Sequence, residues 1–226
     1  MEQFTNLKYT RPDGEALLAG INDAAKAFQN AESYPAAREI FLSLNRKQEH
    51  FHTMEELASI RNSIDTRDAF YEKEMEYFHS VKPRISVEMK KFHKVFLESR
   101  FLPDFERELG QLYIRNVKSR VRLAAECNID LQVRESMLVQ EYYRTAAAPQ
   151  AEFHGETLNF YGLLKKMQDP DREIRKEAMK KWSALYESIS RKLDDIYGEL
   201  VEIRLQMAEN LGFPGYEEMV FLQNKR

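Results

Sequence analysis

The 226-residue chain is long enough for one large domain or two small ones, and 43% of its residues are hydrophobic. Only 8 glycines and 7 prolines are present, which argues against disorder, collagen-like repeats and turn-rich all-β folds, so we expect a helical protein. The net charge of -3 gives no electrostatic reason to bind nucleic acid or an anionic membrane, and neither is expected as a partner.

The N-terminal section shows apolar residues at helical spacing, separated by capping residues and prolines. The first predicted helix carries the apolar stripe from Leu17 to Phe28 and ends near Asn30. Ser33, followed by Pro35, is typical of a cap and first turn, so a second long helix is expected to begin there.

The next helices are bounded by similar signals. Asp65 and Thr66 predict the start of a third helix, which we expect to stop at Lys82–Pro83 because proline cannot continue the hydrogen-bond ladder. Further helices are then expected over residues 85–100, 103–125 and 131–145.

A change of pattern follows, since residues 150–153 and 156–160 alternate around His154-Gly155 and predict a small β-hairpin. We therefore place a domain boundary near Ala148–Pro149, with a helical domain over residues 1–148 and a second domain over 149–226. The fold class expected is all-α, a bundle of long helices with at most one short β-hairpin.

The strongest local signal predicts one very long helix after Asp169-Pro170-Asp171, which supplies a cap, a first-turn proline and acidic residues. Apolar residues recur about every 3.7 positions from Ile174 to Leu211, close to the helical repeat of about 3.6. Gly212 and Pro214 are expected to end this helix.

Cys127 is the single cysteine, so a disulfide within the chain is excluded, and a reducing, cytoplasmic compartment is expected. The first twenty residues lack the apolar core of a signal peptide, and no stretch approaches the roughly 18 apolar residues of a membrane span. No phosphate-binding loop accompanies Cys127, so the simplest interpretation is a packed thiol.

The histidines do not form a zinc-peptidase motif, because His-Glu-x-x-His is absent. His50 and His52 would lie about 200° apart on a helix, so they cannot close on one ion. Solvated or packed side chains are the simplest interpretation, and a site completed by distant residues is the alternative. The five histidines are His50, His52, His79, His93 and His154.

The carboxylates and aromatic residues are also interpreted as structural. Glu72, Glu74 and Glu76, and likewise Asp194-Asp195, are typical of solvated helix faces rather than of an acid and base pair. Seven aromatic residues at helical spacing are expected in the core rather than on a base-stacking surface: Phe70, Tyr71, Tyr77, Phe78, Phe92, Phe96 and Phe101. No catalytic, cofactor-binding or metal-ligating residue is assigned.

Two regions of the sequence resemble a known family. Tyr9–Asp13 and Leu57–Tyr71 are similar to the early helical region of the oligoendopeptidase F type of thimet-oligopeptidase-like zinc peptidases. A second block resembles the middle region of that family and comprises Phe153–Asn159, Asp169–Ala178, Val201–Arg204 and Ala208–Phe213.

The resemblance implies that the chain is the N-terminal part of a zinc-dependent oligoendopeptidase that hydrolyses short unstructured peptides, and that it forms a wall of the substrate channel. Residues 149–226 would begin the peptidase domain, while the zinc ligands would lie in a C-terminal catalytic part beyond Arg226. This chain alone would then hold no zinc and have no activity. The alternative is a free-standing, non-catalytic helical binding or scaffold module.

The expected partners are therefore short peptides and the C-terminal catalytic part. If that part covers the stripe containing Trp182, Ile189, Ile196 and Ile203, the stripe is open in this chain. Either self-association through the stripe or a large exposed apolar patch is then expected.

Overall fold

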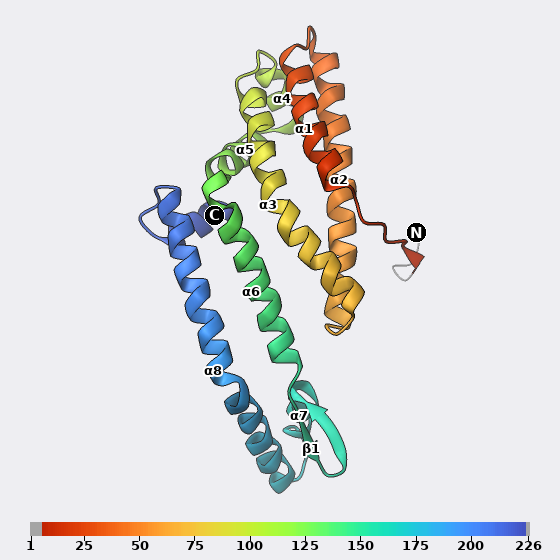
Figure 1. The fold of residues 1–226 in the computed structure, drawn as a ribbon, viewed down its shortest axis with the longest axis vertical. Coiled ribbons are helices and arrows are strands. Elements are labelled where there is room, and N and C mark those ends of the chain that lie inside the picture. Colours follow the sequence, from red (N-terminus) through yellow and green to blue (C-terminus); the bar gives the residue numbers. More distant parts are fainter. Residues whose placement is uncertain (1–5, 225–226) are drawn as a thin grey trace. The chain divides into compact units, whose positions relative to one another are not determined.

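The computed structural model describes residues 6–224, which are almost entirely helical, and Figure 1 shows their path. These residues form nine α-helices and one two-stranded sheet, so the all-α prediction is confirmed. The chain divides into two compact units. The first unit combines residues up to Val133 with those from Leu205 onward, and the second extends from Arg134 to Arg204.

Two boundaries in the first unit lie where the sequence predicts them: the end of the first helix near Asn30 and the start of the second after Ser33. The Oδ1 atom of Asp13 accepts a hydrogen bond of 2.9 Å from the Ala16 amide and caps α1 (Gly14–Gln29). The Ser33 hydroxyl accepts one of 3.4 Å from the Ala36 amide at the start of α2 (Tyr34–Ile64). The predicted cap at Ser33 is therefore confirmed, whereas Asp13 is a cap that the sequence analysis does not identify.

Helix α3 (Ala69–Leu97) corrects two predictions. Its cap is Asp68, whose carboxylate accepts hydrogen bonds from the Phe70 and Tyr71 amides, rather than Asp65 or Thr66. The helix also continues through Pro83, although an internal proline costs about 3 kcal/mol. Pro83 is buried and apolar core residues lie on both sides of it, so tertiary packing outweighs the lost backbone hydrogen bond.

The single helix predicted over residues 103–125 is two helices, α4 (Leu102–Leu109) and α5 (Gln111–Leu123). Gly110 separates them with φ of 84°, a left-handed conformation that residues with a Cβ adopt only at a cost. A 3-10 turn η2 (Glu126–Asn128) follows α5, and the first unit also contains α9 (Tyr216–Gln223), which packs on α5.

Phenylalanines dominate the core of the first unit, where α1 packs against α2 and α3. The Phe96 ring lies 5.5 Å from Phe41 and 5.0 Å from Phe105, centroid to centroid, and all three are buried. The core prediction is confirmed for Phe78, Phe92 and Phe96 but is wrong for Phe70, which is 54% exposed.

The second unit contains the predicted hairpin and most of the predicted long helix. Strands β1 (Gln150–Phe153) and β2 (Glu156–Asn159) pair antiparallel, and the turn residues His154 and Gly155 have φ of 50° and 83°. Helix α7 (Phe160–Lys166) leads into α8 (Arg172–Asn210). A buried cluster joins these elements: Phe153, Leu163, Ala178 and Leu185.

The prediction that the α8 stripe is open is wrong at two of its central positions, since Ile196 is 3% and Ile203 8% exposed. Helix α6 (Ile129–Ala147) lies along α8 within this unit, with a buried Leu138 (Figure 1). Ion pairs between described residues join the two helices: Arg134–Glu199, Lys192–Glu141 and Arg204–Glu135. A partner could not dock on Ile196 or Ile203 without unpacking the chain's own helices.

Candidate functional site

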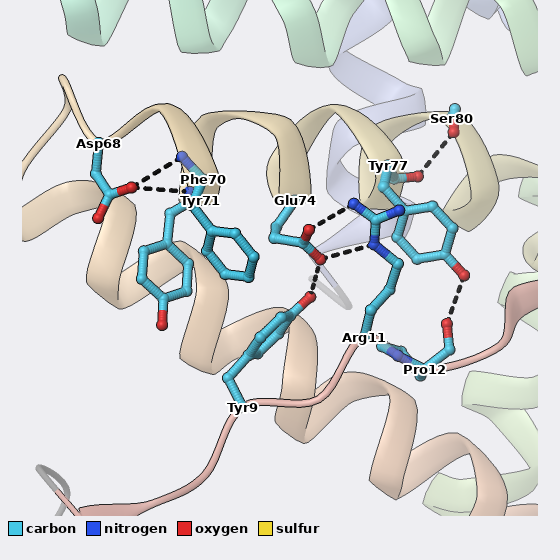
Figure 2. A network of polar contacts seen from close by, with 9 residues as sticks. All are labelled: Tyr9, Arg11, Pro12, Asp68, Phe70, Tyr71, Glu74, Tyr77 and Ser80. Atoms are coloured by element: carbon cyan, nitrogen blue, oxygen red, sulfur yellow. Dashed lines mark hydrogen bonds and ion pairs between the residues drawn. The ribbon is translucent and has the colours of Figure 1, made fainter.

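An extended segment before α1 is held on α3 by a polar network centred on Glu74 (Figure 2). The Glu74 side chain is only 3% exposed. Its carboxylate accepts hydrogen bonds from Arg11 Nε at 2.9 Å, from Arg11 NH2 at 2.5 Å and from the Tyr9 hydroxyl. The N-terminal clamp is the name used below for Tyr9, Arg11, Glu74 and Tyr77.

Tyr77 fixes the backbone where the segment enters α1. Its hydroxyl donates to the Pro12 carbonyl at 2.6 Å and accepts from the Gly14 amide at 2.8 Å. A Cβ atom at Gly14 would lie 2.5 Å from Val81 Cγ1, so only glycine fits this close approach. The segment is therefore fixed by both its side chains and its backbone.

Electrostatics make the clamp an anchor rather than an acid–base centre. The Arg11 hydrogen bonds lower the pKa of Glu74 despite its burial, and the Tyr9 hydroxyl lowers it further. Burial, followed by the hydrogen bond to Glu74, raises the pKa of Tyr9. At neutral pH the carboxylate is thus charged and the phenol protonated, so neither group exchanges a proton there.

The interpretation of Glu74 as a solvated residue is wrong, whereas Glu76 is exposed as expected. A signal for this was present, because Glu74 precedes the buried Phe78 and Val81 by four and seven positions and so shares their helix face. A carboxylate on an apolar face predicts a buried partner, and Arg11 is that partner.

The clamp also unites the two stretches that carry the early part of the family resemblance. The Tyr9 ring packs edge-on against Phe70 at 6.0 Å and Tyr71 at 5.8 Å. Arg61 donates to the Leu7 carbonyl at 2.5 Å and to the Tyr71 hydroxyl at 2.6 Å. These residues therefore act together to hold the N-terminal segment on α2 and α3.

A second polar cluster lies between α2 and α3. Lys82 Nζ is 2.6 Å from one oxygen of the buried Glu55, and His52 Nδ1 is 3.2 Å from the other. Burial raises the pKa of Glu55, but the His52 and Lys82 hydrogen bonds outweigh it and lower the pKa overall. Burial lowers the pKa of nearby His79, so its imidazole stays neutral. The cluster therefore supplies the hydrogen bonds that a buried carboxylate needs.

The other candidate residues lie apart. His93 is buried in α3, His50 is exposed on α2, and the His154 ring lies 2.9 Å from Glu177 across the second unit. Asp194 and Asp195 are exposed as expected. The packed-thiol prediction for Cys127 is wrong, because the residue is exposed in the η2 turn, where the neighbouring Asn128 is the buried residue.

The residues present do not fit a zinc site. Across residues 6–224, no group of three or more His, Cys, Asp or Glu side chains could hold a metal ion. Within the same range no helix is long and apolar enough to cross a membrane.

The family model for the Peptidase M3 N-terminal domain matches residues 4–124, which include the clamp. The chain belongs to this M3 peptidase family. No curated protein matches the chain in sequence.

Solved structures extend the similarity beyond the matched domain. PZ peptidase A in complex with an inhibitor superposes with a TM-score of 0.95 at 27% identity, covering 99% of this chain and 40% of that one. A Bacillus anthracis str. Ames protein assigned as oligoendopeptidase F also superposes with a TM-score of 0.95 at 27% identity, and the match covers 99% of this chain and 41% of that one. The chain thus spans about two fifths of the length of these structures.

Proposed function

We propose that the chain is the N-terminal part of a zinc-dependent oligoendopeptidase that hydrolyses short unstructured peptides in the cytoplasm. The observation that carries this proposal is the match of 99% of the chain to two fifths of the solved peptidase structures. Residues 1–148 would form the N-terminal helical domain, and residues 149–226 would begin the peptidase domain. Zinc and its ligands would then belong to the rest of the protein.

The role of this part is steric and positional. Long helices that form a wall of the substrate channel would admit extended peptides and hold them in place, and such a role requires no reactive side chain. The long helices α2, α3 and α8 of the described residues suit such a wall.

An exposed apolar face of α8 supports a partner surface for the catalytic part. Met179, Tyr186, Tyr197 and Val201 are 50%, 43%, 68% and 38% exposed. Their spacings of seven, eleven and four positions place them on one helix face. Exposed apolar residues grouped in this way favour contact with further protein, so this face replaces the buried stripe as the proposed interface.

The reading frame downstream of Arg226 tests the proposal. A continuation containing His-Glu-x-x-His is expected, and the extended protein should retain about one zinc per chain and cleave a quenched fluorescent peptide but not a folded protein. The 226-residue chain should do neither. A stop codon directly after Arg226, or one zinc retained by this chain after mild chelation, would contradict the proposal.

A further inference from the structure

A groove runs between α1 and α2 on the first unit, formed by two adjoining hollows. The first has a volume of about 600 Å³ and is lined by the end of the clamp segment and both helices. The second has a volume of about 410 Å³ and lies farther along the same two helices. Both hollows are lined by Ser43 and Lys47, so they form one continuous depression.

The first hollow combines a cationic rim with an apolar floor. Arg46 and Lys47 contribute cations from α2, Arg11 contributes one from the clamp segment, and His50 adds an imidazole nearby on α2. The floor is made by Pro12, Leu17 and Phe51, all of which are buried. The carboxylate Asp13 also lines this hollow, but it caps α1. The hollow suits an anionic group attached to an apolar body.

Two of the cations have hydrogen-bond donors left to offer. Arg11 binds Glu74 through Nε and Nη2 while its side chain remains 50% exposed. The Nη1 atom is left to donate hydrogen bonds to a ligand. Lys47 forms no ion pair with any residue that the structure describes. Arg46 is paired with Glu39 at 2.8 Å on the exposed surface, where such a pair is weak and easily exchanged.

The second hollow has the opposite electrostatic character. Asp23 and Glu39 line it, whereas Lys47 at the junction is its only cation. The apolar surface between them comes from Ala24, Ala27 and Leu44. The groove is therefore polarised along its length, with its cationic end near the start of α1 and its acidic end near Ala27.

The groove length matches a short extended peptide. From Ala16 to Asp23 the seven residue steps of α1 span about 10 Å. An extended chain covers about 3.3 Å per residue, so about three residues fit between the cationic end and Asp23. Free peptides of this length carry a carboxylate at one end and an ammonium group at the other. These charges are opposite to those at the cationic and acidic ends of the groove.

We propose that the α1–α2 groove is a non-catalytic binding site for short free peptides, with the peptide carboxylate at Arg11, Lys47 and His50 and the ammonium group at Asp23. The C-terminal side chain would lie on the apolar floor. A phosphate or a nucleotide fits less well, because neither carries an ammonium group that could pair with the acidic end. The groove involves no metal and does not depend on the proposed peptidase function.

Titration calorimetry with the tripeptide Ala-Leu-Phe tests the site on the 226-residue chain. The free acid is expected to bind at least tenfold more tightly than its C-terminal amide, because the amide cannot form charge-assisted hydrogen bonds with the cations. Acetylation of the N-terminus should weaken binding about threefold, since Asp23 is more solvated. Equal affinity for acid and amide, or no binding at millimolar peptide, would overturn the proposal.

Two variants locate the site. Lys47→Gln should weaken binding of the free acid at least fivefold, whereas Lys94→Gln, an exposed lysine on α3 outside the groove, should leave it unchanged. Ala16→Trp, at an exposed groove position, should block binding without altering the circular dichroism spectrum. Equal effects of the two lysine variants, or displacement of the peptide by equimolar inorganic phosphate, would refute the assignment. No hydrolysis is measured, so these results are separate from the peptidase test.

Discussion

Replacing Glu74 by Gln tests the N-terminal clamp directly. The substitution preserves the side-chain shape but removes the charge and one acceptor oxygen from a carboxylate that is 3% exposed and binds three donors. Loss of one partner of a buried ion pair costs about 3–5 kcal/mol. The Arg11 side chain is 50% exposed and can hydrate after the change, so we expect the free energy of unfolding of the first unit to fall by about 2 kcal/mol.

The effect of Glu74→Gln should depend on pH. Because Arg11 lowers the pKa of Glu74 in the folded state, the carboxylate stabilises the protein fully above its ordinary pKa of 4.5. That stabilisation is lost as the pH falls through the lowered folded-state pKa. The difference in unfolding free energy between the native chain and the variant should therefore shrink in acid.

Urea unfolding at pH 7 and at pH 3, followed by circular dichroism, measures both quantities. Glu76→Gln is the matched control, since Glu76 lies on the same helix and is exposed. Fluorescence of Trp182, the single tryptophan, reports on the second unit. A Glu74→Gln variant within about 0.5 kcal/mol of the native chain at pH 7, or a deficit that is the same at pH 3, would refute the role given to the clamp.

Other positions give independent predictions. Burial lowers the pKa of His93 to about 4, so the unfolded state binds its proton first as the pH falls from 6.5. The free energy of unfolding should therefore fall by up to about 3 kcal/mol between pH 7 and pH 4. A melting temperature that falls equally steeply with pH in the His93→Gln variant would contradict this prediction. Gly110→Ala should lower the free energy of unfolding by about 1 kcal/mol, because φ is positive at this position. Gly198→Ala should raise it by about 0.5 kcal/mol, because Gly198 lies within α8 and has open space around its Cβ position. Melting temperatures of the two variants that do not shift in opposite directions would count against this account. Ile196→Glu buries a charge and should lower the free energy of unfolding by more than about 3 kcal/mol. If the urea midpoint measured by Trp182 fluorescence is unchanged in this variant, the apolar stripe of α8 is exposed and the prediction is wrong.

Local signals in the sequence predicted helix ends well where a single side chain decides them. Ser33 caps α2 because its oxygen reaches the amide three positions onward, and this geometry requires no knowledge of the fold. Asp13 caps α1 in the same way, a signal that the prediction passed over. Pro83 failed as a stop signal because the cost of proline is local, whereas its compensation comes from packing of the whole α3 face. Gly110 was a usable signal between two apolar stretches that the prediction passed over.

Burial was harder to predict because it depends on segments far apart in the sequence. The repeat in α8 located its apolar stripe, but whether Ile196 faces another part of the chain depends on α6, more than fifty residues earlier. Cys127 shows the reverse error, since a thiol among small residues was interpreted as packed and lies exposed in a turn. Periodicity thus gives the face of a helix but not the segment that covers it.

Arg11 links the clamp to the groove, and this link gives the clamp a role beyond anchoring the chain. Glu74 holds the guanidinium of Arg11, which lines the cationic end of the groove, through two of its nitrogens, while Tyr77 fixes the adjacent Pro12 that forms part of the floor. A site whose side chains are held before the ligand arrives loses less conformational entropy on binding. Residues 4–124, the region matched by the family model, contain both features, so a peptide-binding role for this domain would rest on helices and ion pairs alone.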